Sequence, residues 1–154
     1  MNATAPARHD ERIRKLAFEK SSLELAVRLM TRIGSASGVD DVIAALLRNL
    51  VDNAIRHTPT SGRVDVAVRR DGIDRHSRAV LEVTDDGPGI PEAERGRVMD
   101  RFYRVPGTGG PGSGIGLAIV RAIASQHGAT VELGAGPGGR GLAARVVFPA
   151  GPAA

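Results

Sequence analysis

The stretch Leu46-Leu47-Arg48-Asn49-Leu50-Val51-Asp52-Asn53-Ala54-Ile55-Arg56-His57-Thr58 decides the fold. It has the i, i+3, i+4, i+7 spacing of an amphipathic helix. The apolar face is formed by Ile43, Leu46, Leu47, Leu50 and Ala54.

A second face of this helix aligns Asn49, Asn53 and Arg56. Two asparagines one turn apart are unusual there, because Glu and Lys have better helix propensity. Amide oxygens can bind Mg²⁺ beside a polyphosphate without adding negative charge. The face therefore predicts a site for magnesium and phosphate, although an ordinary polar helix surface has the same pattern.

The composition is that of a globular protein with one domain. The 154 residues are 42% hydrophobic and 25% charged, and none is cysteine, which excludes disulfides and thiol chemistry. No apolar run approaches the roughly 18 residues of a membrane span, so no span and a cytoplasmic location are expected. Lys and Arg exceed Asp and Glu by 21 − 17 = 4. With one Tyr and three Phe, however, the chain lacks the basic aromatic surface typical of nucleic-acid binding.

The remaining patterns predict an α+β two-layer sandwich, with helices on one face of a mixed, mostly antiparallel sheet. The helix of the opening stretch should end near Thr58, because Pro59 disfavours helical geometry before it. Residues 10–22 suggest a helix, and 23–33 fit a helix or a strand. Strands are expected at 63–69, 79–84, 129–133 and 142–148, and further helices at about 92–100 and 115–127.

A glycine-bearing stretch, Asp85-Asp86-Gly87-Pro88-Gly89-Ile90, follows the second strand directly. A carboxylate at a strand end can accept hydrogen bonds from an exocyclic amine such as that of adenine. Glycines there allow the backbone to approach a flat ligand closely. The stretch therefore predicts a base-binding site, although an acidic turn after an edge strand is the alternative.

A second such stretch, Gly112-Ser113-Gly114-Ile115-Gly116-Leu117, begins a helix after a loop. No strand precedes it, so it does not fit a dinucleotide fingerprint. The unpaired amides of a helix start attract phosphate, and glycines leave room for it. A flexible linker is the alternative, and Ser113 is either a hydroxyl donor or a small turn residue.

Between these stretches lies Arg101-Phe102-Tyr103-Arg104, followed by a loop at 105–112 that is too rich in Gly and Pro for a regular element. We expect Phe102 to anchor this loop to the core. The two arginines either clamp phosphates or are solvated.

Together these stretches resemble the ATP-binding catalytic domain of bacterial sensor histidine kinases, in the wider ATPase family shared with gyrase, Hsp90 and MutL. The N box resembles Asn49-x-x-x-Asn53-Ala54-x-Arg56-x-Thr58, and the stretches beginning at Asp85, Arg101 and Gly112 are similar to the G1, F and G2 boxes. The resemblance covers about 40–149. It implies a Bergerat-type ATP-binding domain at 23–149, an N-terminal extension at 1–22, an ATP lid at about 92–112 and a tail at 150–154.

The resemblance also implies Mg-ATP as the ligand. Asp85 would contact the adenine amine, Asn53 and Asn49 would bind Mg²⁺, and Arg56 would lie near the phosphates. Asn49 stands where hydrolysing relatives have a glutamate that activates water, and an amide cannot act as a base near neutral pH. Asn49, Asn53 and Arg56 are thus the expected catalytic residues, for phosphoryl transfer rather than hydrolysis. The other expected nucleotide contacts are Gly87, Gly89, Ile90, Arg101, Phe102, Arg104, Gly112, Ser113, Gly114, Ile115, Gly116 and Leu117.

The upstream box of an orthodox kinase, a His followed by an acid and Leu-Arg-x-Pro, is not found in this sequence. A histidine on a separate protein or domain, and then a response regulator, are therefore the implied partners. The chain is either an excised domain or a stand-alone catalytic half, and Met1 favours the second. The alternatives are an anti-sigma-factor-like serine kinase or sequestering module, which Asn49 disfavours, and an ATP-binding remnant without transfer.

Overall fold

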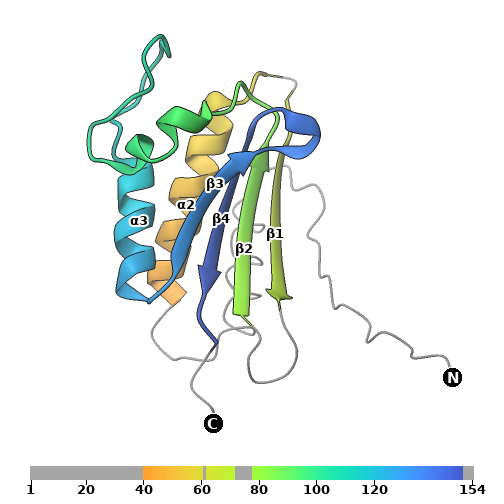
Figure 1. Ribbon diagram of the computed structural model, residues 1–154, viewed down its shortest axis with the longest axis vertical. Helices are drawn as coiled ribbons and strands as arrows, with labels where there is room; N and C mark the ends of the chain where they lie inside the picture. Colours follow the sequence, from red (N-terminus) through yellow and green to blue (C-terminus); the bar gives the residue numbers. More distant parts are fainter. Residues whose placement is uncertain (1–39, 61, 72–77, 151–154) are drawn as a thin grey trace, which may run out of the picture.

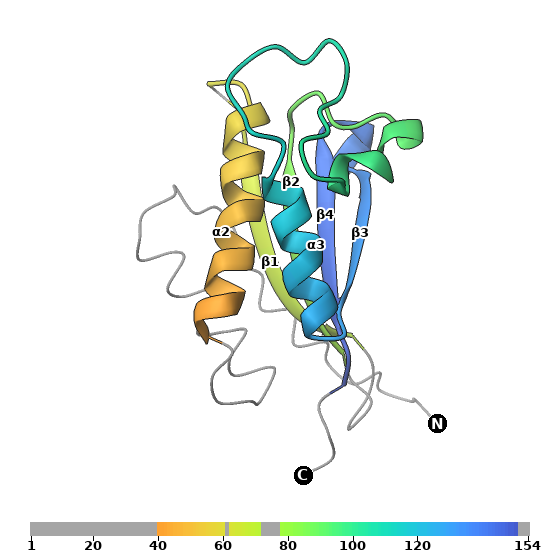
Figure 2. The ribbon, with the colours of Figure 1, turned by 90° about the vertical axis from the view of Figure 1, so that its left-hand side faces the viewer.

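The structure, a computed structural model, describes residues 40–60, 62–71 and 78–150. In this part of the chain two α-helices cover one face of a four-stranded sheet (Figures 1 and 2). The predictions for residues 10–33 lie outside the described residues. The helices are α2 (Asp40–His57) and α3 (Gly116–Gln126), and the strands are β1 (Val64–Asp71), β2 (Arg78–Asp85), β3 (Thr130–Ala135) and β4 (Leu142–Phe148). Short 3₁₀-helices η2 (Glu92–Glu94), η3 (Arg97–Met99) and η4 (Pro137–Gly139) lie in the connections.

The strand order is β1-β2-β4-β3, and every pairing among these strands is antiparallel. In register, Val64 faces Asp85, and Leu81 faces Val146. The last strand of the sequence therefore lies inside the sheet, between β2 and β3. The predicted α+β sandwich with helices on one face is confirmed.

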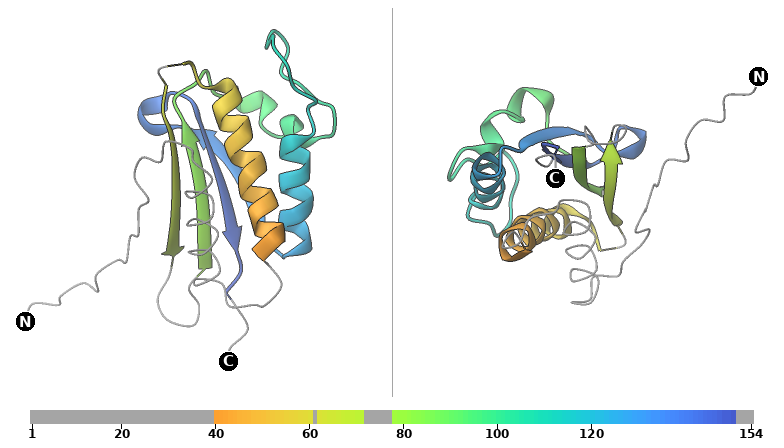
Figure 3. Two further views of the ribbon diagram at one scale, coloured as in Figure 1. Left: turned by 180° about the vertical axis from the view of Figure 1, so that it is seen from behind. Right: turned by 90° about the horizontal axis from the view of Figure 1, so that it is seen from below.

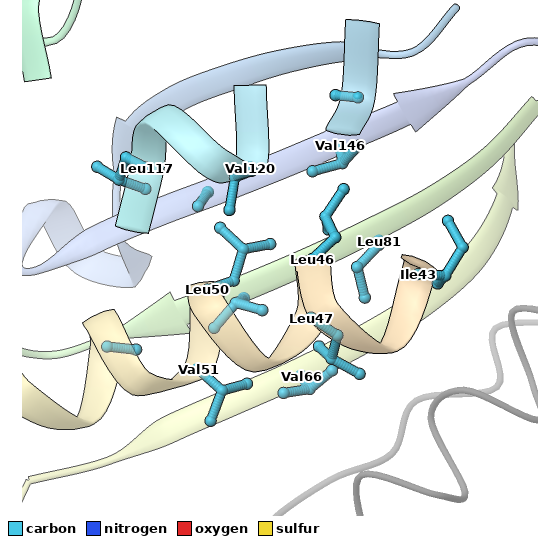
Figure 4. Packing of buried hydrophobic residues seen from close by; sticks show 14 of the residues in the cluster. Ile43, Leu46, Leu47, Leu50, Val51, Val66, Leu81, Leu117, Val120 and Val146 are labelled. Atoms are coloured by element: carbon cyan, nitrogen blue, oxygen red, sulfur yellow. The ribbon is translucent and has the colours of Figure 1, made fainter. Parts of the chain in front are cut away.

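The predicted apolar face of α2 packs against the sheet and α3. Its five residues, Ile43, Leu46, Leu47, Leu50 and Ala54, are each at most 4% exposed. Figure 4 shows this face among Leu81, Val146 and Val120. Since burial of one Leu side chain contributes about 1.5–3 kcal/mol, packing rather than helix propensity holds α2 in place.

The opposite face of the sheet carries a row of charges across neighbouring strands. Glu82, Arg145 and Glu132 lie side by side in the strand register. Arg145 donates from Nε and Nη2 to Glu82 Oε2 at 2.9 and 2.7 Å, and its Nη1 lies 3.8 Å from Glu132. The residues that alternate with this row, among them Leu81 and Val146, belong to the core that α2 and α3 cover.

The prediction of one helix over about 92–100 is wrong in its extent, because only two short 3₁₀-helices form there. The chain forms η2 and η3 there, with Gly96 between them. Val98 is the buried residue of the two short helices. A segment with so little apolar surface to bury cannot offset the low helix propensity of Gly96.

The end of α2, the end of β2, the start of α3 and the turn between β3 and β4 gather at one end of the domain (Figures 1 and 3). The boundaries of α2 and α3 agree with the predicted stop near Thr58 and the predicted helix at about 115–127, and Gly128, which follows α3, has a positive φ of 64°. Among the described helices, none is long and apolar enough to cross a membrane.

Candidate functional site

A pocket of about 370 Å³ opens at this end of the domain. Its walls come from α2, the segment after β2, residues 98–112, the start of α3 and the start of β4. Thirteen of the residues expected at the site line it: Asn49, Asn53, Arg56, Asp85, Gly89, Ile90, Arg104, Gly112, Ser113, Gly114, Ile115, Gly116 and Leu117. The fold thus collects side chains from well-separated stretches of the sequence into one cavity.

The polar face of α2 presents an oriented oxygen to this pocket. Asn49 Nδ2 donates to the carbonyl oxygen of Ala45 at 2.8 Å, which fixes the amide. Asn49 Oδ1 faces the start of α3, where a Cβ built at Gly116 would lie 3.8 Å from it. One turn along, Asn53 is half-buried and lines the same wall.

Arg56 extends from the end of α2 toward the second glycine stretch. A Cβ built at Gly112 would lie 3.3 Å from Arg56 Nη1. A cation is thereby placed beside the glycine-rich start of α3, where backbone amides and the helix dipole already favour anions.

Asp85 is the buried charged side chain of the described core, with 5% of its surface exposed. Its Oδ1 accepts from the backbone amides of Gly87 at 2.9 Å and Leu142 at 3.2 Å. Burial raises the pKa of Asp85, while these two hydrogen bonds and the charge of His57 act in the opposite direction. Among the described residues no donor contacts Oδ2, so this oxygen is available to a donor in the pocket.

Gly87 and Gly89 are required by contacts within the protein. A Cβ at Gly87 would lie 2.5 Å from the carbonyl oxygen of His57, and Gly87 does not line the pocket. Gly89 has a φ of 73°, and a Cβ there would lie 2.6 Å from the carbonyl oxygen of Gly141. At these two positions, the atoms that leave no room for a Cβ belong to other backbone of the protein.

Two glycines of the β3–β4 turn support Asp85 and are absent from the sequence prediction. A Cβ at Gly141 would lie 1.8 Å from the carbonyl oxygen of Asp85, and one at Gly136 would lie 2.8 Å from it. The sequence shows a Gly-rich turn there, but it gives no sign that the turn folds over the end of β2.

Phe102 does not anchor the following loop to the core, and that expectation is wrong. Its side chain is 72% exposed and borders, with Arg101, a separate groove of about 240 Å³ beside α3. Tyr103 takes the inner position: it lines the main pocket and its hydroxyl donates a hydrogen bond to Glu94. The Cζ atom of Arg97 lies 4.4 Å from the centroid of the Tyr103 ring. Phe102 has a φ of 65° and donates its N–H to the Gly114 carbonyl oxygen at 3.0 Å, and this turn places Tyr103 on the core side.

Arg104 lines the pocket and also holds the loop that follows it. Its Nη2 donates to the carbonyl oxygens of Gly110 at 2.7 Å and Thr108 at 3.3 Å. Among the residues that sequence reasoning missed, Asp52 and His57 share the asparagine face of α2 and follow from helical spacing. The complete set is Asp52, His57, Pro88, Val98, Tyr103, Val105, Thr108, Pro111, Ile119 and Leu142.

The oxygen atoms of the pocket suit a magnesium ion whose other ligands are phosphate oxygens and waters. In the described part of the chain, no group of three or more His, Cys, Asp and Glu residues is placed to hold a metal. The pocket instead offers the oriented Oδ1 of Asn49 and the amide of Asn53. Mg²⁺ commonly takes one or two protein oxygens and completes its shell with phosphates and waters, so these residues fit it.

Comparison with known proteins gives a consistent result. Residues 38–152 match the family described as "Histidine kinase-, DNA gyrase B-, and HSP90-like ATPase". The chain is 38% identical over 136 residues to the sensor protein kinase PmrB of Pseudomonas aeruginosa, covering 88% of this chain and 28% of that protein. It is 35% identical over 116 residues to the sensor protein QseC of Escherichia coli K12, covering 75% and 24%. The chain therefore spans about a quarter of the length of these relatives.

Solved structures share the fold. The mycobacterial sensor histidine kinase MprB superposes with a TM-score of 0.66 at 32% identity, covering 86% of this chain and 96% of that chain. The catalytic domain of the histidine kinase ThkA superposes with a TM-score of 0.59 at 20% identity, covering 88% and 97%, which supports the fold alone. With most of its length matched by the family and the fold in agreement, this chain belongs to the histidine kinase-, DNA gyrase B- and HSP90-like ATPase family.

Proposed function

We propose that the chain binds Mg-ATP and transfers the γ-phosphoryl group to a histidine on a separate protein or domain, as the catalytic half of a two-component signalling kinase. The observation that carries this is the single pocket shared by the α2 amides, Asp85 and the glycine-rich start of α3. Two relatives support it: PmrB is named a sensor protein kinase, and ShkA, 25% identical over 87% of this chain with a TM-score of 0.61, was solved in complex with AMPPNP. A response regulator would receive the phosphoryl group next, in the cytoplasm.

At the base end of the pocket, Asp85 Oδ2 accepts a hydrogen bond from the exocyclic amine of adenine. A charge-assisted bond of this kind contributes about 1.5–3 kcal/mol, enough to distinguish an amine from a carbonyl at the same position. The apolar side chains of Ile90, Val98 and Leu117 line the same pocket, and the base would pack against them.

At the phosphate end, Arg56 and the amides at the start of α3 bind the triphosphate. Asn53 and Asn49 are the residues that would hold Mg²⁺, which supplies positive charge to the phosphate oxygens when bound. Arg104 already donates to the carbonyl oxygens of Thr108 and Gly110, so it holds residues 105–112 at the mouth of the pocket.

Transfer is favoured over hydrolysis because position 49 holds an amide, which cannot act as the base for an attacking water near neutral pH. In the transfer, a nitrogen of the acceptor imidazole bonds to the γ-phosphorus while the bond to the bridging oxygen breaks, and ADP leaves. The contribution of this chain is the positioning of the nucleotide and the charge around it.

The test begins with Asn53→Ala. Loss of the amide oxygen is expected to weaken magnesium-dependent ATP binding at least about tenfold, as measured by calorimetric titration. A tenfold loss of affinity corresponds to about 1.4 kcal/mol of binding free energy. Gln126→Ala is the control, because it removes an amide side chain from the other helix, α3, at an exposed position outside the pocket. Wild-type affinity in Asn53→Ala contradicts the metal assignment.

The acceptor is identified with radiolabelled ATP, magnesium and candidate histidine-containing proteins. Acid-labile label on the partner supports a histidine kinase. Acid-stable label points to the serine kinase alternative, and ATP binding without any labelled partner points to a regulatory ATP-binding domain.

A further inference from the structure

Asp52 is a carboxylate at the pocket for which the proposed function has no role. It lies on the same face of α2 as Asn49 and Asn53, and it lines the same cavity. Its side chain is exposed, so the folding of the domain does not depend on burying it. A negative charge beside a triphosphate site needs an explanation, because it repels the ligand that the rest of the site attracts.

The ordinary use of such a carboxylate is an ion pair along the helix. Arg48 and Arg56 stand four residues before and after Asp52, which is the spacing at which helical ion pairs form. In the described part of the chain, however, neither arginine forms an ion pair with Asp52. Arg56 extends instead toward Gly112. Asp52 therefore presents to the pocket a carboxylate that has no ion-pair partner among the described residues.

The effect of this charge depends on the form of the nucleotide. A metal-free triphosphate carries the larger negative charge and is repelled more strongly than its magnesium complex. A magnesium ion that keeps several of its waters also attracts a nearby carboxylate through those waters. The Asp52 carboxylate would thus repel the metal-free triphosphate and attract its magnesium complex.

We propose that Asp52 makes the pocket selective for the metal-loaded nucleoside triphosphate over the metal-free form. Asn49 and Asn53 would bind the metal through neutral oxygens, and Asp52 adds a charge that acts on the metal-loaded and metal-free forms differently. This inference rests on the proposed function, since it requires a triphosphate in this pocket.

The experiment compares ATP affinity in excess magnesium with ATP affinity in a chelator, at low ionic strength, for the wild-type chain and Asp52→Asn. The substitution keeps the shape and removes the charge. Metal-free affinity is expected to rise on the order of five- to tenfold, as for one unit charge acting across a solvated pocket, and the rise should shrink as salt is added. Affinity in magnesium should stay constant or fall, so the ratio of the two affinities falls.

Glu132→Gln is the matched control. It removes the same charge from the opposite face of the sheet, where Glu132 lies near Arg145. An equal change of the ratio in this control, or an unchanged ratio in Asp52→Asn, overturns the inference. A wild-type chain that binds ATP in neither condition overturns the proposed function instead, so the two failures are distinguishable.

Discussion

The two sides of the pocket are stabilised in different ways. The side at Asp85 is held by close packing of main-chain segments. Gly136 and Gly141 lie so near the carbonyl oxygen of Asp85 that neither position has room for a Cβ. Across the pocket, residues 92–112 bury only Val98 fully, pack Met99, Tyr103 and Val105 partly against the core, and are further held by polar contacts of Tyr103 and Arg104. Close backbone packing tolerates no added atom, whereas a loop held by a few hydrogen bonds does. We therefore expect the Asp85 side to open only on global unfolding and the 92–112 segment to open at a lower free energy.

The largest expected effect is that of Gly141→Ala. With a φ of 73° and a Cβ position 1.8 Å from the Asp85 carbonyl oxygen, Ala cannot fit unless the turn moves. The free energy of unfolding should fall by about 3 kcal/mol or more in urea denaturation. Gly109→Ala, where a Cβ would meet nothing within 4 Å, should change it by less than about 0.5 kcal/mol. Similar losses in both variants would remove the contrast between the two sides.

Asp85→Asn sharpens the comparison by separating binding from folding. The amide oxygen can still accept from Gly87 and Leu142, which leaves the NH₂ group facing the pocket and the adenine amine. ATP affinity should fall on the order of tenfold to a hundredfold, equivalent to the lost bond of about 1.5–3 kcal/mol. Inosine triphosphate, which presents a carbonyl there, should lose much less. Equal losses for both nucleotides would contradict the assignment of Asp85 to the base.

The difference in stability between the wild type and Asp85→Asn should depend on pH in a defined direction. Burial raises the pKa of Asp85 in the folded chain. Its favourable contribution is therefore present below the ordinary pKa of about 4 and is lost as the pH rises through the raised value. Melting curves from about pH 4 to pH 7 should show the wild type losing stability relative to Asp85→Asn. A difference that moves the other way would show that the amide hydrogen bonds outweigh burial.

The smallest expected effect is that of Tyr103→Phe. The ring still packs against the core, but the hydrogen bond to Glu94 is lost. The free energy of unfolding should fall by no more than about 1 kcal/mol, because the carboxylate of Glu94 can accept hydrogen bonds from water in place of the Tyr103 hydroxyl. Amide hydrogen exchange in 105–112 should nevertheless become faster, while the amides of β2 keep wild-type protection. Unchanged exchange in that loop would show that Tyr103 does not hold it.

Local periodicity accounts for what the sequence predicted correctly. The stripe of α2 and the alternation of the strands are short-range patterns, and both were found with their approximate ends. The roles of Gly87 and Gly141 depend on which strands become neighbours, and the order β1-β2-β4-β3 has no local signal. Phe102 and Tyr103 have equivalent sequence signals, and a single positive φ decides which of them faces inward.

The position of β4 has a consequence for biosynthesis. Leu142 donates to a carboxylate 57 residues earlier in the chain, and β2 has no partner on that side until β4 is present. A nascent polypeptide leaving the ribosome therefore carries α2, β2 and the start of α3 before the strand that orients Asp85 has been translated. The pocket is therefore completed only late in synthesis, and until then the edge of β2 that pairs with β4 is without this partner.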